Sequence, residues 1–150
     1  MDVYKLLHQD HETVKGIFKE LEETTERGVK KRESLFSELN VELTIHAQAE
    51  EKFLYPLLKE AEESHELSLE AVEEHKVVKK LLKELENGDK GTEEWAAKLK
   101  VLQENVEHHV KEEEQELFKK AKKVIDSETA EQIASQIEAY KEEQLQALGS

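Results

Sequence analysis

Residues 46–57 read HAQAEEKFLYPL, and residues 109–120 read HVKEEEQELFKK. Both stretches contain a histidine, a glutamate four positions later and a second glutamate directly after it. Histidine and glutamate at positions i and i+4 lie one turn apart on the same face of an α-helix. The motif occurs twice, 63 residues apart, and therefore predicts two matching helices that present the same side chains.

A second pair of similar stretches lies upstream of the first pair. Residues 10–15 read DHETVK, and residues 74–79 read EHKVVK, 64 positions later. The chain thus contains a duplicated helix pair, which predicts a bundle with approximate twofold symmetry. Such a bundle can supply matching ligands to two metal ions.

Apolar residues recur at helical spacing between clear interruptions. They predict helices over about 2–25, 31–62 and 64–85, and a fourth that begins at Thr92. Ser64 is expected to cap the third helix, which should stop at Asn87-Gly88. Pro56 should kink the second helix or loosen its last turn. Such short connections favour an up-down-up-down four-helix bundle.

A weaker amphipathic segment follows the predicted bundle. It contains Ile133, Ile137, Tyr140 and Leu148. The expected organisation is therefore a bundle over residues 1–126 and a C-terminal amphipathic helix or tail over residues 127–150. This segment could be a fifth helix packed on the bundle, or a homodimer contact through residues 127–148.

Composition supports an all-α class and excludes several kinds of function. The 150 residues suit one domain, and include one proline, five glycines, no cysteine and 39% charged residues. A net charge of −14 disfavours nucleic acid as a partner. The sequence has no long apolar run and no signal peptide, so a membrane is not expected as a partner either. The expected location is the cytoplasm. The lack of cysteine excludes thiol chemistry within this sequence.

Six ionisable residues fall where the apolar seams of the helices should continue. In the first helix, Leu7, Val14 and Phe18 define a seam that passes through position 11. In the second, the inner face is expected to run from Leu35 to Leu57. The inward ionisable residues on the four seams are His11, His46, Glu50, His75, His109 and Glu113.

These six groups favour a metal site over the simpler alternatives. A single His-x-x-x-Glu on a charged helix is usually a surface pair, and a lone inward histidine is usually a hydrogen-bonded core residue. Six such groups on four seams would each cost several kcal/mol if buried without partners. A cation offsets that cost, because it neutralises the carboxylates and binds the imidazole lone pairs.

The donor types narrow the choice of metal. Imidazole and carboxylate without sulfur suit iron, manganese or zinc. Structural zinc prefers four ligands and often thiolate, whereas six side chains that share two ions leave coordination positions open. An oxo or hydroxo bridge, water, dioxygen, peroxide or nitric oxide could occupy those positions.

These motifs resemble the hemerythrin HHE cation-binding domain over residues 3–124. The resemblance rests on Asp10-His11, on residues 46–56, on Glu74-His75 and on residues 109–118. It implies a non-haem di-iron centre in which Glu50 and Glu113 bridge the ions. The resemblance further implies that His11, His46, His75 and His109 are terminal ligands.

The pattern differs from that of the oxygen-carrying hemerythrins at two positions. Those proteins have a histidine where this chain has Lys79, and an aspartate where it has Glu114. Both differences argue against reversible oxygen carriage.

Other polar residues could contact the ligands from outside. The candidates are Tyr4, His8, Lys15, Lys79 and Glu114. Lys15 and Lys79 each follow a predicted histidine ligand by one turn and could favour anions near the pocket mouth. His108 aligns with Ile45 and is expected to flank the core, whereas His65 should be solvated.

Three functions remain open at this point. The leading hypothesis is a di-iron binding or sensing module for dioxygen, nitric oxide or iron itself. A second is an enzyme, either a peroxide-decomposing di-iron oxidoreductase or a small oxidase. The third is a structural helical module whose site is empty or holds zinc.

Overall fold

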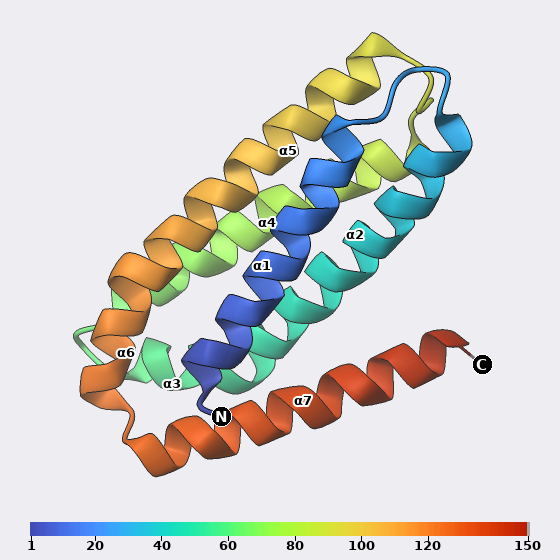
Figure 1. Ribbon diagram of the computed structural model, residues 1–150. Coiled ribbons are helices and arrows are strands. Elements are labelled where there is room, and N and C mark those ends of the chain that lie inside the picture. The colour runs from blue at the N-terminus through green and yellow to red at the C-terminus, as the bar shows by residue number, and fades with distance from the viewer. Residues whose placement is uncertain (150) are drawn as a thin grey trace.

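The computed structural model describes residues 1–149, and all regular structure in that range is helical (Figure 1). The bundle consists of α1 (Val3–Glu22), α2 (Val29–Ala49), α4 (His65–Asn87) and α5 (Glu93–Glu112). Successive helices run in opposite directions and are joined by short turns. This arrangement confirms the predicted all-α, up-down-up-down bundle.

Several predicted helix ends are confirmed, although one cap residue makes a different hydrogen bond from the one expected. Thr92 begins α5, and its hydroxyl accepts a hydrogen bond from the Trp95 backbone N–H at 3.2 Å. The helix before it ends at Asn87, as expected. Ser64 is the N-cap residue of α4, as predicted, but its hydroxyl makes no capping hydrogen bond and instead donates to the Leu58 carbonyl at 2.6 Å. The hydroxyl thus fastens the preceding turn to α3.

Two π-helical turns interrupt the long helices at matching places. α2 continues through η1 (Glu50–Leu54) into α3 (Tyr55–Glu60), and α5 through η2 (Glu113–Leu117) into α6 (Phe118–Val124). Pro56 is the second residue of α3, the helix that follows η1, and it lacks a backbone N–H, which suits an interrupted helix. η2 forms with Lys119 at the equivalent position, so proline is not required for the turn.

The first π turn also corrects the predicted inner face of the second helix. Each π turn adds one residue to the helical turn and rotates the residues after it. Leu57 was expected inside but is 40% exposed, whereas Leu58 is fully buried. Leu54 and Tyr55 are buried as well.

Two apolar clusters enclose the middle of the bundle. One includes Val14, Leu43 and Val106, and the other includes Leu7, Leu54 and Leu117. The six predicted site residues lie between these clusters along each helix. The site therefore occupies a polar layer that apolar packing closes on both sides.

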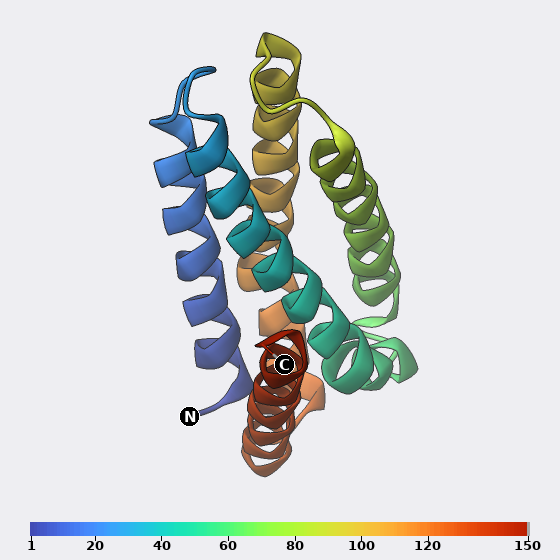
Figure 2. The same ribbon diagram turned by 90° about the vertical axis from the view of Figure 1, so that its right-hand side faces the viewer.

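The C-terminal segment forms helix α7 (Ser127–Gly149), which crosses the end of the bundle that holds the N-terminus (Figures 1 and 2). It packs against α1, α2 and η1, and it buries Ile133 and Ile137. The predicted seam continues to the half-buried Tyr140, which packs against the core, but not to Leu148, which is 63% exposed. The segment is thus a fifth helix packed on the bundle, while the homodimer contact stays a prediction. Ser150 lies outside the described residues.

Within residues 1–149, no helix combines the length and apolar character that crossing a membrane requires.

Candidate metal centre

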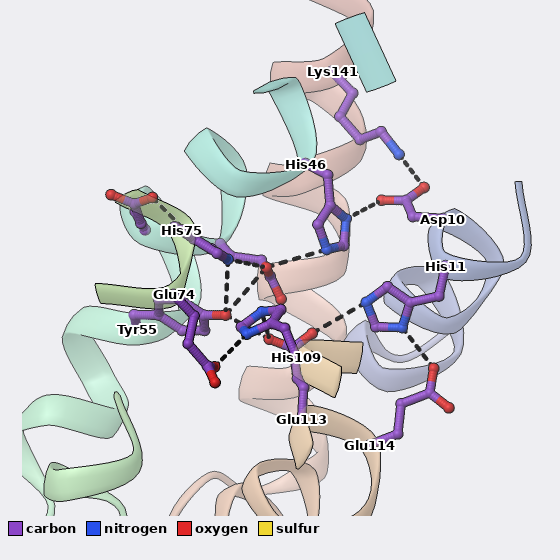
Figure 3. Close-up of polar contacts among 12 residues, drawn as sticks. Asp10, His11, His46, Tyr55, Glu74, His75, His109, Glu113, Glu114 and Lys141 are labelled. Carbon is purple, nitrogen blue, oxygen red and sulfur yellow. Dashed lines mark hydrogen bonds and ion pairs between the residues drawn. The ribbon is translucent and has the colours of Figure 1, made fainter. Parts of the chain in front are cut away.

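The six ionisable side chains on the predicted seams meet in the interior of the bundle (Figure 3). Counted as whole residues, each of the six is at most 8% exposed, and the two glutamates are 0% and 2% exposed. One histidine comes from each of the four bundle helices, and one glutamate from each π turn. The residues with their elements are His11 on α1, His46 on α2, Glu50 on η1, His75 on α4, His109 on α5 and Glu113 on η2.

The six side chains form two groups of potential metal donors that share one carboxylate. Within each group, the donor atoms lie within 4.8 Å of one another. Glu50 belongs to both groups, so its carboxylate is placed to bridge two ions. The first group is His11, His46, Glu50 and Glu113, and the second is Glu50, His75 and His109.

The carboxylates lie close to the Nε2 atoms of all four histidines. Glu50 Oε1 is 3.1 Å from His46 Nε2 and 3.2 Å from His75 Nε2. Glu113 Oε1 is 3.2 Å from His11 Nε2, and Glu113 Oε2 is 3.4 Å from His109 Nε2. The four imidazoles thus direct the same ring nitrogen at the shared interior.

Several of these buried atoms have no hydrogen-bond partner, although buried polar atoms usually do. They all belong to the two donor groups and carry the lone pairs that a cation would use. Metal ions therefore fit this site better than hydrogen bonding alone. The unpartnered donor atoms are His11 Nε2, His46 Nε2, His109 Nε2, Glu50 Oε2 and Glu113 Oε1.

A carboxylate contacts the other ring nitrogen, Nδ1, of every site histidine. Such contacts set the tautomer and orientation of a metal-binding imidazole. Of these four carboxylates, only Glu114 was a candidate from the sequence. The Nδ1 contacts are His11–Glu114 at 2.5 Å, His46–Asp10 at 2.8 Å, His75–Glu51 at 2.8 Å and His109–Glu74 at 2.6 Å.

These four contacts form a closed ring around the bundle. Each outer carboxylate directly precedes or follows a site residue in the sequence, and it contacts the histidine of the next helix around the bundle. The ring runs from Asp10 on α1 to α2, from Glu51 on η1 to α4, from Glu74 on α4 to α5, and from Glu114 on η2 back to α1.

Tyr55 makes the two halves of the centre chemically different. Its hydroxyl donates to Glu113 Oε2 at 2.5 Å, and Glu50 Oε1 lies 3.1 Å from the same oxygen. Tyr55 and Phe118 occupy the same position in the two repeated stretches, and neither was predicted to belong to the site. Phe118 has no hydroxyl and instead stacks on the His11 ring with centroids 6.5 Å apart.

Without metal, the centre is a network of paired charges. Burial alone would lower the pKa of His109, but the carboxylates of Glu113 and Glu74 raise it to about 10. Burial likewise opposes charge on Glu113, yet the neighbouring imidazoles of His109 and His11 hold its pKa well below the usual value. Burial and the Glu113 charge raise the pKa of Tyr55 well above 10. A metal ion must therefore displace protons from the imidazoles.

A small apolar cavity of about 40 Å³ adjoins the four histidines. Apart from the imidazole rings, its walls are aliphatic, and they include Val14, Leu43, Val78 and Val106. Its volume exceeds the space that one water molecule needs. An open groove of about 470 Å³ between α1 and α5 shares the lining residues His11, Val14, Val106 and Val110 with this cavity.

The remaining predicted residues lie at the edges of the site. His8 is exposed and contacts Glu114 Oε2 at 2.9 Å, and Lys15 lines the groove beside His11. Lys79 is exposed, and its charge helps to lower the pKa of Glu51. Tyr4 packs against Phe118 with ring centroids 5.2 Å apart, and its hydroxyl has no partner.

The predictions for the other two histidines have different outcomes. The side chain of His108 is 66% exposed, so the expectation that it flanks the core is wrong. His65 is exposed at the start of α4, as expected.

Comparison with known proteins points to one family. The family model described as hemerythrin HHE cation binding domain matches residues 2–121. A crystal structure of a hemerythrin HHE cation binding domain-containing protein from Mycobacterium kansasii superposes with a TM-score of 0.83 at 26% identity. That match covers 100% of this chain and 93% of the other.

One relative is named for a different activity. A protein of Nostoc sp. strain PCC 7120, described as a DNA nickase, is 29% identical over 155 residues. The match covers 99% of this chain but only 42% of the length of the relative.

Proposed function

The chain belongs to the hemerythrin HHE cation-binding domain family, and from this premise we propose that it holds two iron ions in its interior and handles a small uncharged ligand there. Both carboxylates are proposed to bridge the ions, because Glu50 belongs to both donor groups and Glu113 lies beside one histidine of each group. The first ion is held by His11, His46, Glu50 and Glu113, and the second by Glu50, Glu113, His75 and His109.

Five buried donor atoms without hydrogen-bond partners are the main support for metal binding. An unpartnered buried polar atom costs free energy, and five that converge on one interior are not explained by packing. The outer carboxylates add support, because each contacts Nδ1 of an imidazole and leaves Nε2 for a metal.

The donor set favours iron over zinc. Imidazole and carboxylate groups suit several divalent metals, but structural zinc sites are usually closed by four ligands of which thiolates are common. The two groups here share a carboxylate and contain no sulfur. Iron in such a site supplies redox chemistry and open positions for a small molecule.

The cavity supports a ligand of the size of dioxygen, nitric oxide or hydrogen peroxide. Its volume of about 40 Å³ excludes larger organic molecules, and its aliphatic walls disfavour an ionic ligand. The four histidine rings form part of the cavity wall, so a ligand there lies beside the proposed ions.

A second candidate function is the decomposition of peroxide, for which the groove is a specific observation. Lys15 and Lys111 line the groove, and they could attract a polar or anionic molecule toward His11. A peroxide-decomposing enzyme needs such an exchange route, whereas a sensor needs only occupancy of the cavity.

The nicking activity named for the Nostoc protein is not part of this proposal. The shared region is less than half of that protein. A net charge of −14 also repels a nucleic-acid backbone.

The decisive experiment is elemental analysis of protein purified without added metal, followed by anaerobic loading with ferrous iron and an absorption spectrum. We expect two irons per chain, and nitric oxide should then perturb the spectrum. Rapid oxygen evolution from added peroxide would favour the enzyme over the binding protein. Zinc in place of iron, or no metal even after ferrous loading, would contradict the proposal.

The variant Glu50→Ala tests the shared carboxylate. Because Glu50 belongs to both donor groups, its loss should lower the content of both ions and reduce the melting temperature together. His65→Ala is the control and should leave the metal content unchanged, although it removes the contact of His65 Nδ1 with the Lys59 carbonyl at 2.6 Å. A Glu50→Ala protein with full iron content would show that the ligands are assigned wrongly.

A further inference from the structure

Asp10 and Glu74 are equivalent carboxylates in the two halves of the repeat, but the groups on their solvent side differ. Asp10 and Glu74 occupy matching positions, and each contacts a site histidine through one oxygen. The second oxygen of Asp10 is paired with the ammonium group of Lys141 from α7 (Figure 3). The second oxygen of Glu74 instead lies 4.0 Å from Nε2 of His108. The outer oxygen of Asp10 is thus paired with the Lys141 ammonium group, whereas the outer oxygen of Glu74 faces the His108 imidazole.

Glu74, His108 and Glu112 form a third group of possible metal donors. His108 Nε2 is 3.4 Å from Glu112 Oε1, and the donor atoms of all three residues lie within 4.8 Å of one another. The repeat counterparts of His108 and Glu112 are Ile45 and Ala49, which are both buried. The group is therefore specific to the second half and is not a copy of a motif in the first.

The composition of this group suits a divalent transition-metal ion. Two carboxylates this close repel each other, and a cation between them removes the repulsion, as Lys141 neutralises Asp10 in the other half. One imidazole and two carboxylates are ligands for ferrous iron, manganese or zinc. Three protein ligands leave positions for water, so a bound ion stays exchangeable.

Two of the three residues of this group, Glu74 and Glu112, line a narrow crevice that reaches the inner centre. His109 and Glu113 line it as well, and their side chains are 9% and 1% exposed. His109 Nε2 and Glu113 Oε1 have no hydrogen-bond partner. The crevice has a volume of about 10 Å³, so an ion passes only when side chains move aside.

We propose that Glu74, His108 and Glu112 form an outer binding site for a divalent transition-metal ion, from which the ion passes along the crevice to the inner centre. The transfer exchanges ligands only, and no electron is moved. Glu74 connects the two sites, since its Oε1 contacts His109 Nδ1 at 2.6 Å while Oε2 faces His108. Binding at the outer site does not depend on the proposed function, whereas the transfer to the inner centre rests on it.

Binding is tested by titration of the iron-loaded protein with zinc in a calorimeter, with iron content measured afterwards. The parent should bind one further zinc ion, and the double variant His108→Ala/Glu112→Gln should lose it. The control is Glu84→Gln/Lys98→Ala, because Glu84 on α4 and Lys98 on α5 form an exposed pair 3.7 Å apart that lines neither the groove nor the crevice. Absence of the extra zinc in the parent, or its persistence in the His108→Ala/Glu112→Gln protein, would overturn the outer site.

Transfer is tested by the rate at which metal-free protein takes up limiting ferrous iron without oxygen, with a chelator added at set times. The His108→Ala/Glu112→Gln protein should load about tenfold more slowly but reach the same iron content, since it keeps every inner ligand. The control should load like the parent. Equal rates, or a lower final iron content, would contradict the transfer step.

The two proposals can fail separately. If the parent takes up no iron, the proposed function fails, and the zinc titration is then repeated on the metal-free protein. A parent that binds one more zinc ion than the His108→Ala/Glu112→Gln protein would still support the outer site. Equal zinc binding by the two proteins would overturn it.

Discussion

Each site histidine uses its two ring nitrogens differently, and this division explains how the interior tolerates so many ionisable groups. Nδ1 contacts an outer carboxylate, while Nε2 faces the inner glutamates. In the metal-free protein both carboxylates favour a protonated ring, as the raised pKa of His109 shows. In the metal-bound protein the same ring must be neutral, because the lone pair of Nε2 binds the ion.

The metal-free protein should therefore lose stability in base. His109 has a folded pKa of about 10 and an ordinary value of 6.5, so its contribution is complete below pH 6.5 and disappears as the pH rises through 10. We expect the free energy of unfolding to fall by on the order of 2–4 kcal/mol between pH 6 and pH 10. Urea unfolding at several pH values measures this fall.

The variant His109→Gln isolates the contribution of that ring. Its free energy of unfolding should depend less on pH over the same range, because one titrating group is gone. A parent stability that stays level or rises toward pH 10 would contradict the expected sign.

The inward placement of the six donor residues could be predicted from the sequence at the residue scale, but the outer carboxylates could not. Histidines and glutamates on an apolar seam are conspicuous, because such positions normally hold aliphatic residues. Asp10, Glu51 and Glu74 lie beside the seam on a chain with 36 acidic residues, so nothing in their type distinguishes them. Their position next to a site residue in both repeats was the available signal.

At the scale of the element, the π turns decide which side chains reach the centre. In η1 the turn starts at Glu50, and it places Tyr55, five residues later, with its hydroxyl beside the Glu50 carboxylate. A regular α-helix brings together residues three and four apart rather than five. This shift could not be predicted, because the apolar residues before η1 have ordinary α-helical spacing. That spacing was extended past the π turn, and Leu57 was therefore predicted to be buried.

Pro56→Ala should preserve the first π turn. Since η2 forms without proline, we expect unchanged metal content and a change in the free energy of unfolding of less than about 1 kcal/mol. Deletion of Lys52, which is exposed within η1, should instead restore the α-helical register and turn Tyr55 away. Metal analysis and thermal unfolding of both proteins check this difference.

Lys52→Ala is the control for the deletion, because the ammonium of Lys52 lies 5.0 Å from the Tyr140 ring centroid and its loss alone has an effect. Loss of metal from the Pro56→Ala protein, or full metal content after the deletion, would show that the turn does not set the site.

At the scale of the whole molecule, α7 is joined to the centre through charge as well as packing. Lys141 pairs with Asp10, and Asp10 in turn contacts His46. The side chains of Lys141 and Asp10 are 18% and 10% exposed, so the pair is only weakly screened by water. The amphipathic pattern predicted the helix, but not this contact between residues 131 positions apart.

Lys141→Met should destabilise the protein by about 1–3 kcal/mol, because it leaves a buried carboxylate without its cation. The double variant Asp10→Asn/Lys141→Met should recover part of that loss, and urea unfolding of all four proteins of the cycle gives the coupling energy. Strict additivity of the two single changes would show that the pair contributes nothing.

The shared donor groups also have a consequence for the history of the chain. The first group takes Glu113 from the second half, and the second group takes Glu50 from the first, so neither half holds a complete centre. An ancestor with one helix pair could assemble such a centre only by pairing two identical copies. A duplication that joined two such copies would let each diverge, and the two halves do differ at the equivalent positions 55 and 118, which hold tyrosine and phenylalanine.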